Sequence, residues 1–153
     1  MRDVGGGALT APDAARLQSA LTYFAEAAPR HTADEEHSLF PRLRQCADPA
    51  VNRTLERVAR LEMEHRQAGL HHAAIDRLAR QWIAAGGLEP EDSMALHGHL
   101  MVLRGLYQLH IAIEDQEVFP AAALLLSTQA IEEIGREMME RRSATSTAGP
   151  RGR

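Results

Sequence analysis

Apolar residues recur at steps of three and four along most of the chain, which is the spacing of one face of an α-helix. The first apolar stripe follows a glycine-rich lead-in over residues 1–9 and a candidate N-cap at Thr10. The same register continues through His31 and Glu35, so two polar residues occupy positions that the stripe assigns to the buried face. The apolar members of this stripe are Leu17, Leu21, Phe24 and Ala28.

A second long helix is predicted to start at Asp48-Pro49, an N-cap followed by proline, and to stop at Gly86-Gly87. A third long helix is predicted to begin near Pro90, and its stripe also carries histidines. No segment shows the alternation of a β-strand. The pattern therefore predicts an all-α fold, an antiparallel up-and-down helical bundle whose long helices are joined by short loops.

A last short helix is predicted over roughly Thr128 to Arg142, capped by Ser127. Its apolar residues lie three and four apart, so the helix could fold back against the bundle. The segment after it is small and polar, and we expect it to be disordered. The expected organisation is a flexible lead-in (1–9), a helical bundle (10–142) and a disordered tail (143–153).

Composition agrees with a helical bundle and excludes some functions. Aromatic residues make up only 4% of the 153 residues, which is low for a sheet protein. The net charge is −4 and no basic stripe stands out, so nucleic-acid binding is not supported. A single cysteine, Cys46, excludes an intramolecular disulfide and fits a reducing compartment. With no signal segment and no long apolar run, a cytoplasmic protein without membrane contact is expected.

Two segments of the chain repeat one motif. "HTADEEHSLFP" starts at His31 and "HIAIEDQEVFP" starts at His110, and each has a glutamate four residues on, Glu35 and Glu114. Both copies end in Phe-Pro at the same offset. Residues four apart share one face of a helix, and here that face is the apolar one.

Carboxylates on an apolar face predict a common partner for the two motifs. A buried carboxylate is costly unless it is paired or bound to a metal. A cation would satisfy both glutamates and both histidines at once, and His65 interrupts the stripe of the middle helix with a further ligand type. The residues therefore predict a shared metal site formed by His31, Glu35, His65, His110 and Glu114.

The other polar candidates are weaker. Three histidines fall off the stripes or away from the motif face and are expected to be solvated: His37, His71 and His97. Three acids beside the motif glutamates are expected on the wet faces of their helices: Asp34, Glu36 and Asp115. His72 and His99 lie on the stripes; either could touch the metal, although capping the core or a hydrogen bond to a metal ligand is favoured. Tyr107, on the face of His110, is either a core aromatic residue or a hydroxyl that faces the metal site.

The two motifs and the segment around His65 resemble the hemerythrin-like, HHE cation-binding family. In that family a four-helix bundle holds a non-haem di-iron centre. The family motif is His-x-x-x-Glu followed closely by Leu-Phe-Pro, and "HTADEEHSLFPRL" and "HIAIEDQEVFP" look like its two copies. "EMEHRQAGL" looks like the helix between them and supplies His65. The resemblance covers roughly residues 15 to 125. It implies an oxo- or hydroxo-bridged di-iron cofactor, with manganese or zinc less favoured.

The chain departs from the family pattern in two ways. No histidine precedes His31, so the family's first helix, with its ligand, is expected to be absent, lost from the gene model or replaced by another chain. Classical oxygen carriers of the family place another histidine where this chain has Gly69. A ligand set of three histidines and two glutamates remains. Apolar stripes left uncovered by a missing helix would face water, so a homodimer is a possible partner arrangement.

Three functions are compatible with a helical bundle that carries these candidate metal ligands. The first is a binding protein that takes up O₂, NO, peroxide or iron itself for sensing, storage or scavenging. The second is an enzyme that uses the same centre to act on peroxide or NO. The third is a structural or interaction module with a mononuclear zinc or no metal. The sequence alone does not separate the first function from the second.

Overall fold

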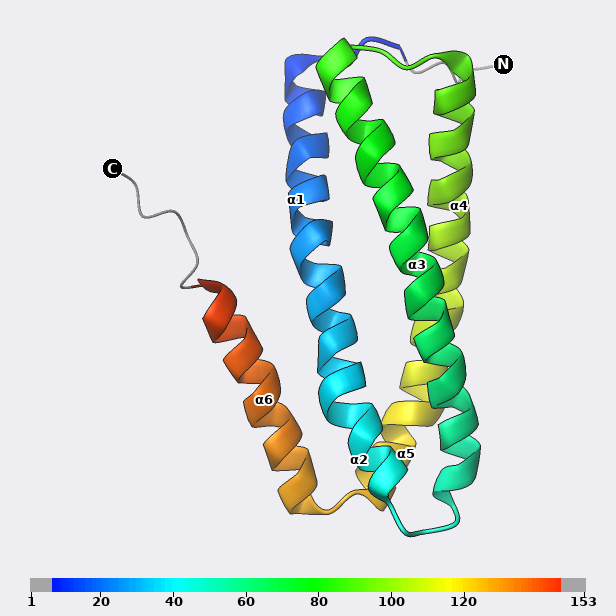
Figure 1. Ribbon diagram of the computed structural model, residues 1–153, viewed down its shortest axis with the longest axis vertical. Helices are drawn as coiled ribbons and strands as arrows, with labels where there is room; N and C mark the ends of the chain where they lie inside the picture. The colour runs from blue at the N-terminus through cyan, green and yellow to red at the C-terminus, as the bar shows by residue number, and fades with distance from the viewer. Residues whose placement is uncertain (1–6, 147–153) are drawn as a thin grey trace. The chain divides into compact units, whose positions relative to one another are not determined.

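The computed structural model describes the backbone of residues 7–146, and every element in that range is helical (Figure 1). The expected all-α fold class is confirmed. Two of the segments, labelled η, are π-helical turns. In chain order the elements are α1 (Ala11–Asp34), η1 (Glu35–Leu39), α2 (Phe40–Gln45), α3 (Val51–Ala85), α4 (Pro90–Ile113), η2 (Glu114–Val118), α5 (Phe119–Leu125) and α6 (Thr128–Ser146).

The start of α1 follows the predicted cap. The Thr10 hydroxyl accepts a hydrogen bond from the Asp13 N–H at 3.3 Å, and the Thr10 carbonyl accepts one from the Ala14 N–H at 2.9 Å. A threonine in this position satisfies backbone donors that have no partner inside the helix. Side-chain capping therefore sets where the first helix begins.

The two ends of α3 also agree with the sequence. The Asp48 carboxylate accepts a hydrogen bond from the Ala50 N–H at 2.8 Å, and the helix begins one residue later. At the other end Gly86 has a φ of 73° and follows the last helical residue, Ala85. Only glycine adopts that left-handed conformation readily, so the helix stops there.

The last helix begins where it was predicted, with the Ser127 hydroxyl accepting from the Ala130 N–H at 3.2 Å. It runs to Ser146, past the expected end at Arg142. The rest of the expected tail, and residues 1–6 of the expected lead-in, lie outside the described residues. On the apolar stripe of α6, Ile134 is buried in a core shared with other helices, whereas Ile131 remains exposed.

The repeated motif has a repeated backbone. Each motif glutamate is the first residue of a π-helical turn, Glu35 in η1 and Glu114 in η2. In each turn the phenylalanine N–H donates to the carbonyl five residues earlier, from Phe40 to Glu35 and from Phe119 to Glu114. A proline follows each phenylalanine, and proline disturbs a regular helical ladder. Such turns are often found at functional sites.

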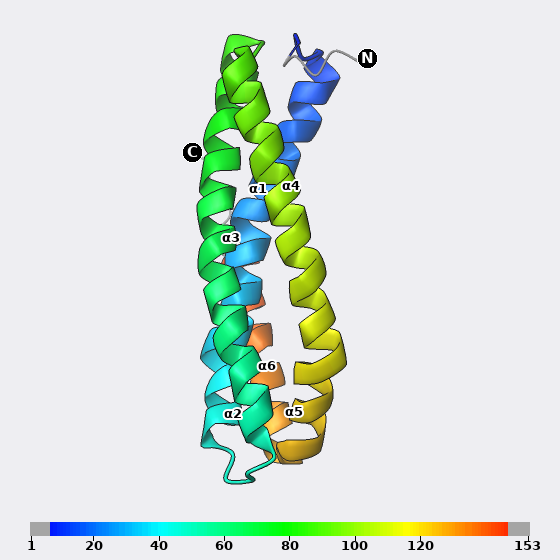
Figure 2. The ribbon, with the colours of Figure 1, turned by 90° about the vertical axis from the view of Figure 1, so that its right-hand side faces the viewer.

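The described chain divides into two compact units, and several helices contribute to both. The first unit comprises residues 7–26 and 63–111, so it contains parts of α1, α3 and α4, which lie side by side within it (Figures 1 and 2). The Phe24 ring packs against His72 with 5.8 Å between centroids, and His72 bonds to Tyr107. These contacts join one residue from each of the three helices.

The second unit comprises residues 27–62 and 112–146 of the described chain. It contains both π-turns, the start of α3 and all of α6. Its core is a single apolar cluster that draws residues from each of these segments. The buried members are Leu39, Phe40, Leu43, Val51, Val58, Leu61, Ile113, Val118, Ala122 and Ile134.

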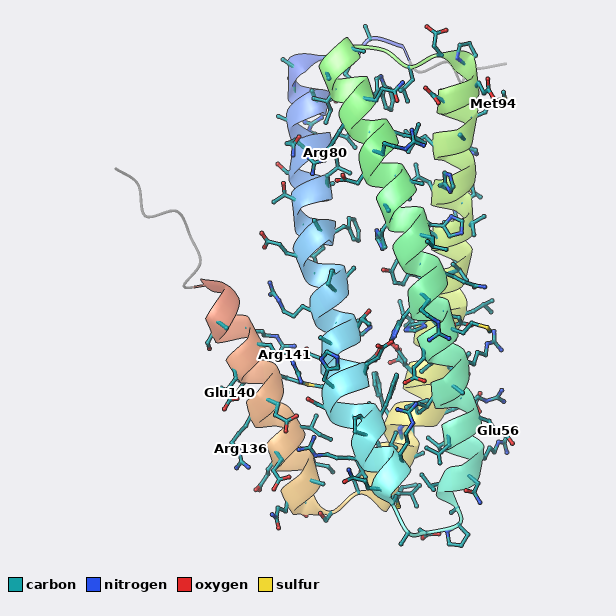
Figure 3. All side chains as sticks on the ribbon, viewed as in Figure 1. Glu56, Arg80, Met94, Arg136, Glu140 and Arg141 are labelled. Carbon is teal, nitrogen blue, oxygen red and sulfur yellow. The ribbon has the colours of Figure 1, made fainter. Side chains whose placement is uncertain are left out.

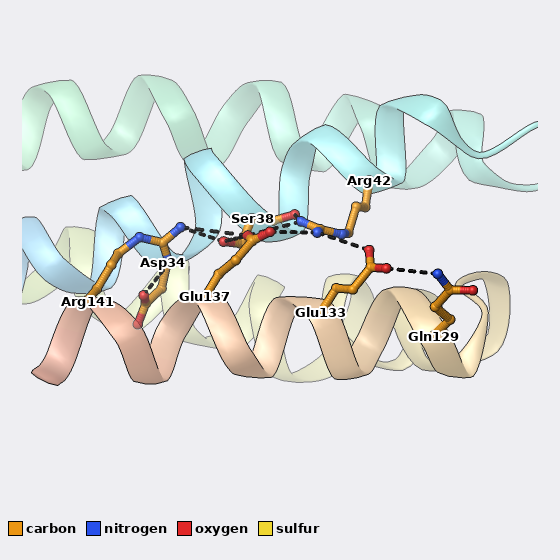
Figure 4. Close-up of polar contacts among 7 residues, drawn as sticks. All are labelled: Asp34, Ser38, Arg42, Gln129, Glu133, Glu137 and Arg141. Atoms are coloured by element: carbon orange, nitrogen blue, oxygen red, sulfur yellow. Dashed lines mark hydrogen bonds and ion pairs between the residues drawn. The ribbon is translucent and has the colours of Figure 1, made fainter.

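A network of charged side chains fixes α6 to the first motif within the second unit (Figure 4). Arg141 donates to Asp34 at 2.7 Å and also contacts the Ser38 hydroxyl. Arg42 donates to Glu137 at 2.7 Å, and the Ser38 hydroxyl donates to the same carboxylate. The three motif-side residues lie four apart, so one face of the α1–α2 segment carries the whole network.

Candidate metal centre

In the second unit, both motif glutamates lie beside the first motif histidine. His31 Nε2 lies 3.7 Å from an oxygen of Glu35 and 3.7 Å from an oxygen of Glu114. One ligand atom from each of the three side chains lies within 4.8 Å of the others. The histidine comes from the end of α1, and the two glutamates open η1 and η2. Segments distant in the sequence therefore bring an imidazole and two carboxylates to one point.

Burial makes this group unusual. Glu35 and Glu114 are only 2% and 3% exposed, whereas the His31 side chain is 48% exposed. Placing two carboxylates in a buried position is unfavourable unless positive charge compensates them. The group thus has anionic ligands on the inside and an open imidazole on the outside, an arrangement that suits a cation reached from solvent.

The pKa of His31 reflects the negative charge of the carboxylates around it. A side-chain hydrogen bond to Glu114 raises the pKa of His31 above its ordinary value, in opposition to the effect of partial burial. The charges of Glu35, Glu114 and Asp34 raise this pKa further. A proton on the imidazole supplies positive charge between the carboxylates, and a metal ion would have to replace that proton to bind the ring nitrogen.

The first unit holds the other two predicted histidines as a pair. His65 Nε2 and His110 Nε2 lie 3.1 Å apart, and His110 is only 3% exposed. His110 is four residues before Glu114 along the continuous α4–η2 segment. The five predicted ligands are therefore found as a group of three in one unit and a pair in the other. A single site formed by all five stays a prediction.

Glu64 was not predicted to be a functional residue. Its carboxylate accepts a hydrogen bond from His110 Nδ1 at 3.1 Å, and Glu64 is 6% exposed. A carboxylate on one ring nitrogen fixes the tautomer and leaves Nε2 as the nitrogen with a lone pair. Its position in the sequence could have revealed it. Glu64 lies three residues after Leu61 and four before Ala68, and all three residues are on the buried face of α3.

Two predictions about neighbouring residues are wrong. Asp34 was expected on the wet face of its helix but is 5% exposed, because Arg141 and Arg142 from α6 pair with it. His71 was expected to be solvated but is half-buried and pairs with His99 at 2.9 Å between Nδ1 atoms. In both cases the partner comes from another helix, which helical spacing cannot reveal.

The structure also shows the exposure and the contacts of the remaining candidate residues. His37, His97 and Asp115 are exposed, as expected, and Glu36 is half-buried. The Tyr107 hydroxyl and His72 Nε2 form a hydrogen bond of 2.8 Å. Burial raises the pKa of Tyr107. The pKa of His72 is lowered, first by burial and then by the nearby charge of His71.

Comparison with known proteins identifies the family. Within residues 7–146, no helix combines the length and the apolarity that a membrane crossing requires. The chain has no significant match among curated proteins or among solved structures. The model of the hemerythrin HHE cation-binding domain matches residues 2–122, a range that includes both His-x-x-x-Glu motifs and His65 and leaves out α6. Because this match spans most of the chain, the protein belongs to the hemerythrin HHE cation-binding domain family.

Proposed function

We propose that this protein binds a non-haem di-iron centre and uses it to take up O₂, NO, peroxide or iron itself for sensing, storage or scavenging. The observation that carries the proposal is the position of His31 between the buried carboxylates of Glu35 and Glu114. Membership of a cation-binding family supports it independently.

The donor set suits iron. Mixed imidazole and carboxylate ligands are typical of non-haem iron, and manganese or zinc would also accept them. In the proposed centre Glu35 and Glu114 would supply carboxylate oxygens. His31, His65 and His110 would each supply one nitrogen. Iron, when bound, supplies the redox chemistry and the binding of small oxygen or nitrogen ligands.

The protein's own residues prepare the site for such an ion. The Glu64 carboxylate orients the His110 ring, so that Nε2 is the nitrogen available for a metal. The Asp34 carboxylate, immediately before Glu35, is held by two arginines and therefore turned to α6. The half-exposed His31 leaves a route from solvent for the ion or for a small ligand.

Metal analysis of the protein as purified tests the proposal. We expect about two irons per chain, as in other carboxylate-bridged centres held in helical bundles, with near-ultraviolet absorption from the bridged ferric pair. Glu114→Ala should lose most of the iron, whereas Asp115→Ala, which removes the exposed neighbouring carboxylate, should retain it. Protein that contains no iron, or equal retention by the two variants, would overturn the assignment.

A further inference from the structure

Aromatic side chains form a series of ring contacts through the first unit. Tyr23 on α1 contacts Phe24 edge to face, with 5.4 Å between ring centroids. The Phe24 ring lies 5.8 Å from the ring of His72 on α3, which lies 5.9 Å from the ring of Tyr107 on α4. Tyr23 is 65% exposed, whereas Tyr107 is half-buried. The series therefore runs from solvent into the unit.

Both ends of this series are phenols. The sequence has two tyrosines, three phenylalanines and one tryptophan, and both tyrosines belong to the series. A phenol loses one electron to a strong oxidant far more readily than a phenylalanine ring or an imidazole does. Two oxidisable rings are thus joined by the less oxidisable rings of Phe24 and His72.

Tyr107 and His72 form a phenol–imidazole pair suited to proton transfer. The Tyr107 hydroxyl lies 2.8 Å from His72 Nε2. Burial, and then the charge of His71, lowers the pKa of His72, and burial raises the pKa of Tyr107, so both groups are neutral at pH 7. In the tautomer with its proton on Nδ1, the imidazole accepts the phenol hydrogen at Nε2. A phenol that loses an electron becomes a strong acid, and the His72 ring is in position to take its proton.

Tyr107 is also a neighbour of a proposed iron ligand. It precedes His110 by three residues on α4, and side chains three apart in a helix have about 5–6 Å between their Cβ atoms. His110 is oriented by Glu64 and lies beside His65 in the same unit. An electron that leaves Tyr107 therefore has a short path to an ion bound by His110.

We propose that Tyr107, with His72 as its proton acceptor, is a one-electron donor to the iron centre when hydrogen peroxide has oxidised that centre. This inference rests on the proposed function, because it requires iron bound by His110. Tyr107 gives one electron to the iron and its phenol proton to His72 Nε2. A neutral tyrosyl radical then lies beside an imidazolium.

The exposed tyrosine completes the route to the surface. Tyr23 returns an electron to Tyr107 through Phe24 and releases its own proton to water, while His72 returns the proton to the Tyr107 oxygen. Each peroxide accepts two electrons and two protons and leaves as two water molecules, so two such oxidations balance one peroxide. Oxidising equivalents thus move to the surface and away from the histidine ligands.

Freeze-quench electron paramagnetic resonance of the iron-loaded, full-length protein tests the donor. Hydrogen peroxide should produce a tyrosyl radical signal in the wild type, and iron-free protein should give none. Tyr107→Phe should abolish the signal at unchanged iron content, because the ring and its packing are retained. Tyr23→Phe, which removes the other tyrosine, is the matched control. It should keep the signal, with a longer lifetime because the route to the surface is interrupted.

A second variant tests the proton acceptor. His72→Phe keeps a ring against Phe24 but offers no nitrogen to the phenol, so radical formation should slow about 100-fold. An unchanged rate in this variant would overturn the role of His72. Iron-loaded wild type without a radical, or a full signal in Tyr107→Phe, would overturn the donor and leave the iron proposal standing. Protein that binds no iron would overturn both proposals.

Discussion

Asp34 and Arg141, which are 107 residues apart in the sequence, form an ion pair of 2.7 Å. Asp34 immediately precedes the motif glutamate Glu35, and Arg141 belongs to α6, which lies outside the region matched by the family model. A helix added after the family domain is therefore fixed to the residue next to a proposed metal ligand. The pair is also substantially buried, with side-chain exposures of 7% and 23%.

The first prediction is that Arg141→Ala destabilises the protein. The substitution leaves the buried Asp34 carboxylate with its ion pair to Arg142, at 3.2 Å, but without its shorter ion pair to Arg141. Leaving a buried charged group poorly paired costs about 1–3 kcal/mol. Urea unfolding should show a loss of that size. Arg136→Ala, which removes an exposed arginine from the same helix (Figure 3), should change stability by less than about 0.5 kcal/mol. Equal effects of the two substitutions would contradict the importance of the pair.

The second prediction concerns acid. Hydrogen bonds from Arg42 and then from Ser38 lower the pKa of Glu137 from 4.5 to about 2. A carboxyl group with a lowered pKa in the folded state stabilises the fold above its unfolded value of 4.5, and this contribution is lost as the pH falls through about 2. Melting temperatures measured between pH 5 and pH 2 should therefore fall more steeply for the wild type than for Glu137→Gln. Parallel curves would contradict the prediction.

The third prediction couples metal to stability. Removal of the ion leaves two carboxylates in a buried position, and protonated ligands bind metal poorly. Chelation should therefore lower the melting temperature of the iron-loaded protein. His110→Ala should lose most of its iron, and Glu36→Ala, beside the proposed ligand Glu35, should retain it. Chelation without any shift in the melting temperature would argue that the iron does not sit in the folded core.

The fourth prediction is the homodimer expected from the sequence. One face of α4 in the first unit is exposed and apolar, with Met101 49% and Leu109 56% exposed. On the same face a Cβ atom added at Gly98 or Gly105 would meet nothing within 4 Å, so another helix could approach closely. Sedimentation at micromolar concentration should give a dimer that Met101→Glu converts to the 16.8 kDa monomer. A wild-type monomer under these conditions would refute the prediction.

Local signals in the sequence predicted most of the helix boundaries. Thr10, Asp48 and Ser127 act through hydrogen bonds to backbone groups two or three residues away, and Gly86 acts through its own φ angle. Such effects need no knowledge of the tertiary structure. The same holds for the shared face of His31 and Glu35, because four residues in a helix fix it.

The features that were missed depend on partners from distant segments. Asp34 is buried only because arginines of α6 reach it. His71 is paired only because α4 places His99 opposite it. Hydrophobic periodicity assigns each residue to a face of its helix. It does not say which other helix covers that face, or which side chains of that other helix lie against it. Polar residues that are buried by pairing with each other are therefore assigned to solvent.

The π-turn at the first motif has a consequence for insertions and deletions. In a regular α-helix Phe40 would lie about 140° around the axis from Glu35, five residues earlier. The wider turn brings the two residues to the same side, and both are buried. A continuous α-helix would bury Glu35 and Phe40 on one side at a spacing of four residues. The π-turn uses a spacing of five, so the segment contains one extra residue. Deletion of the exposed His37 would leave a spacing of four residues, which an ordinary α-turn accommodates with Phe40 still in the core. Loss of one residue at this position should thus alter the presentation of the Glu35 carboxylate while sparing the fold.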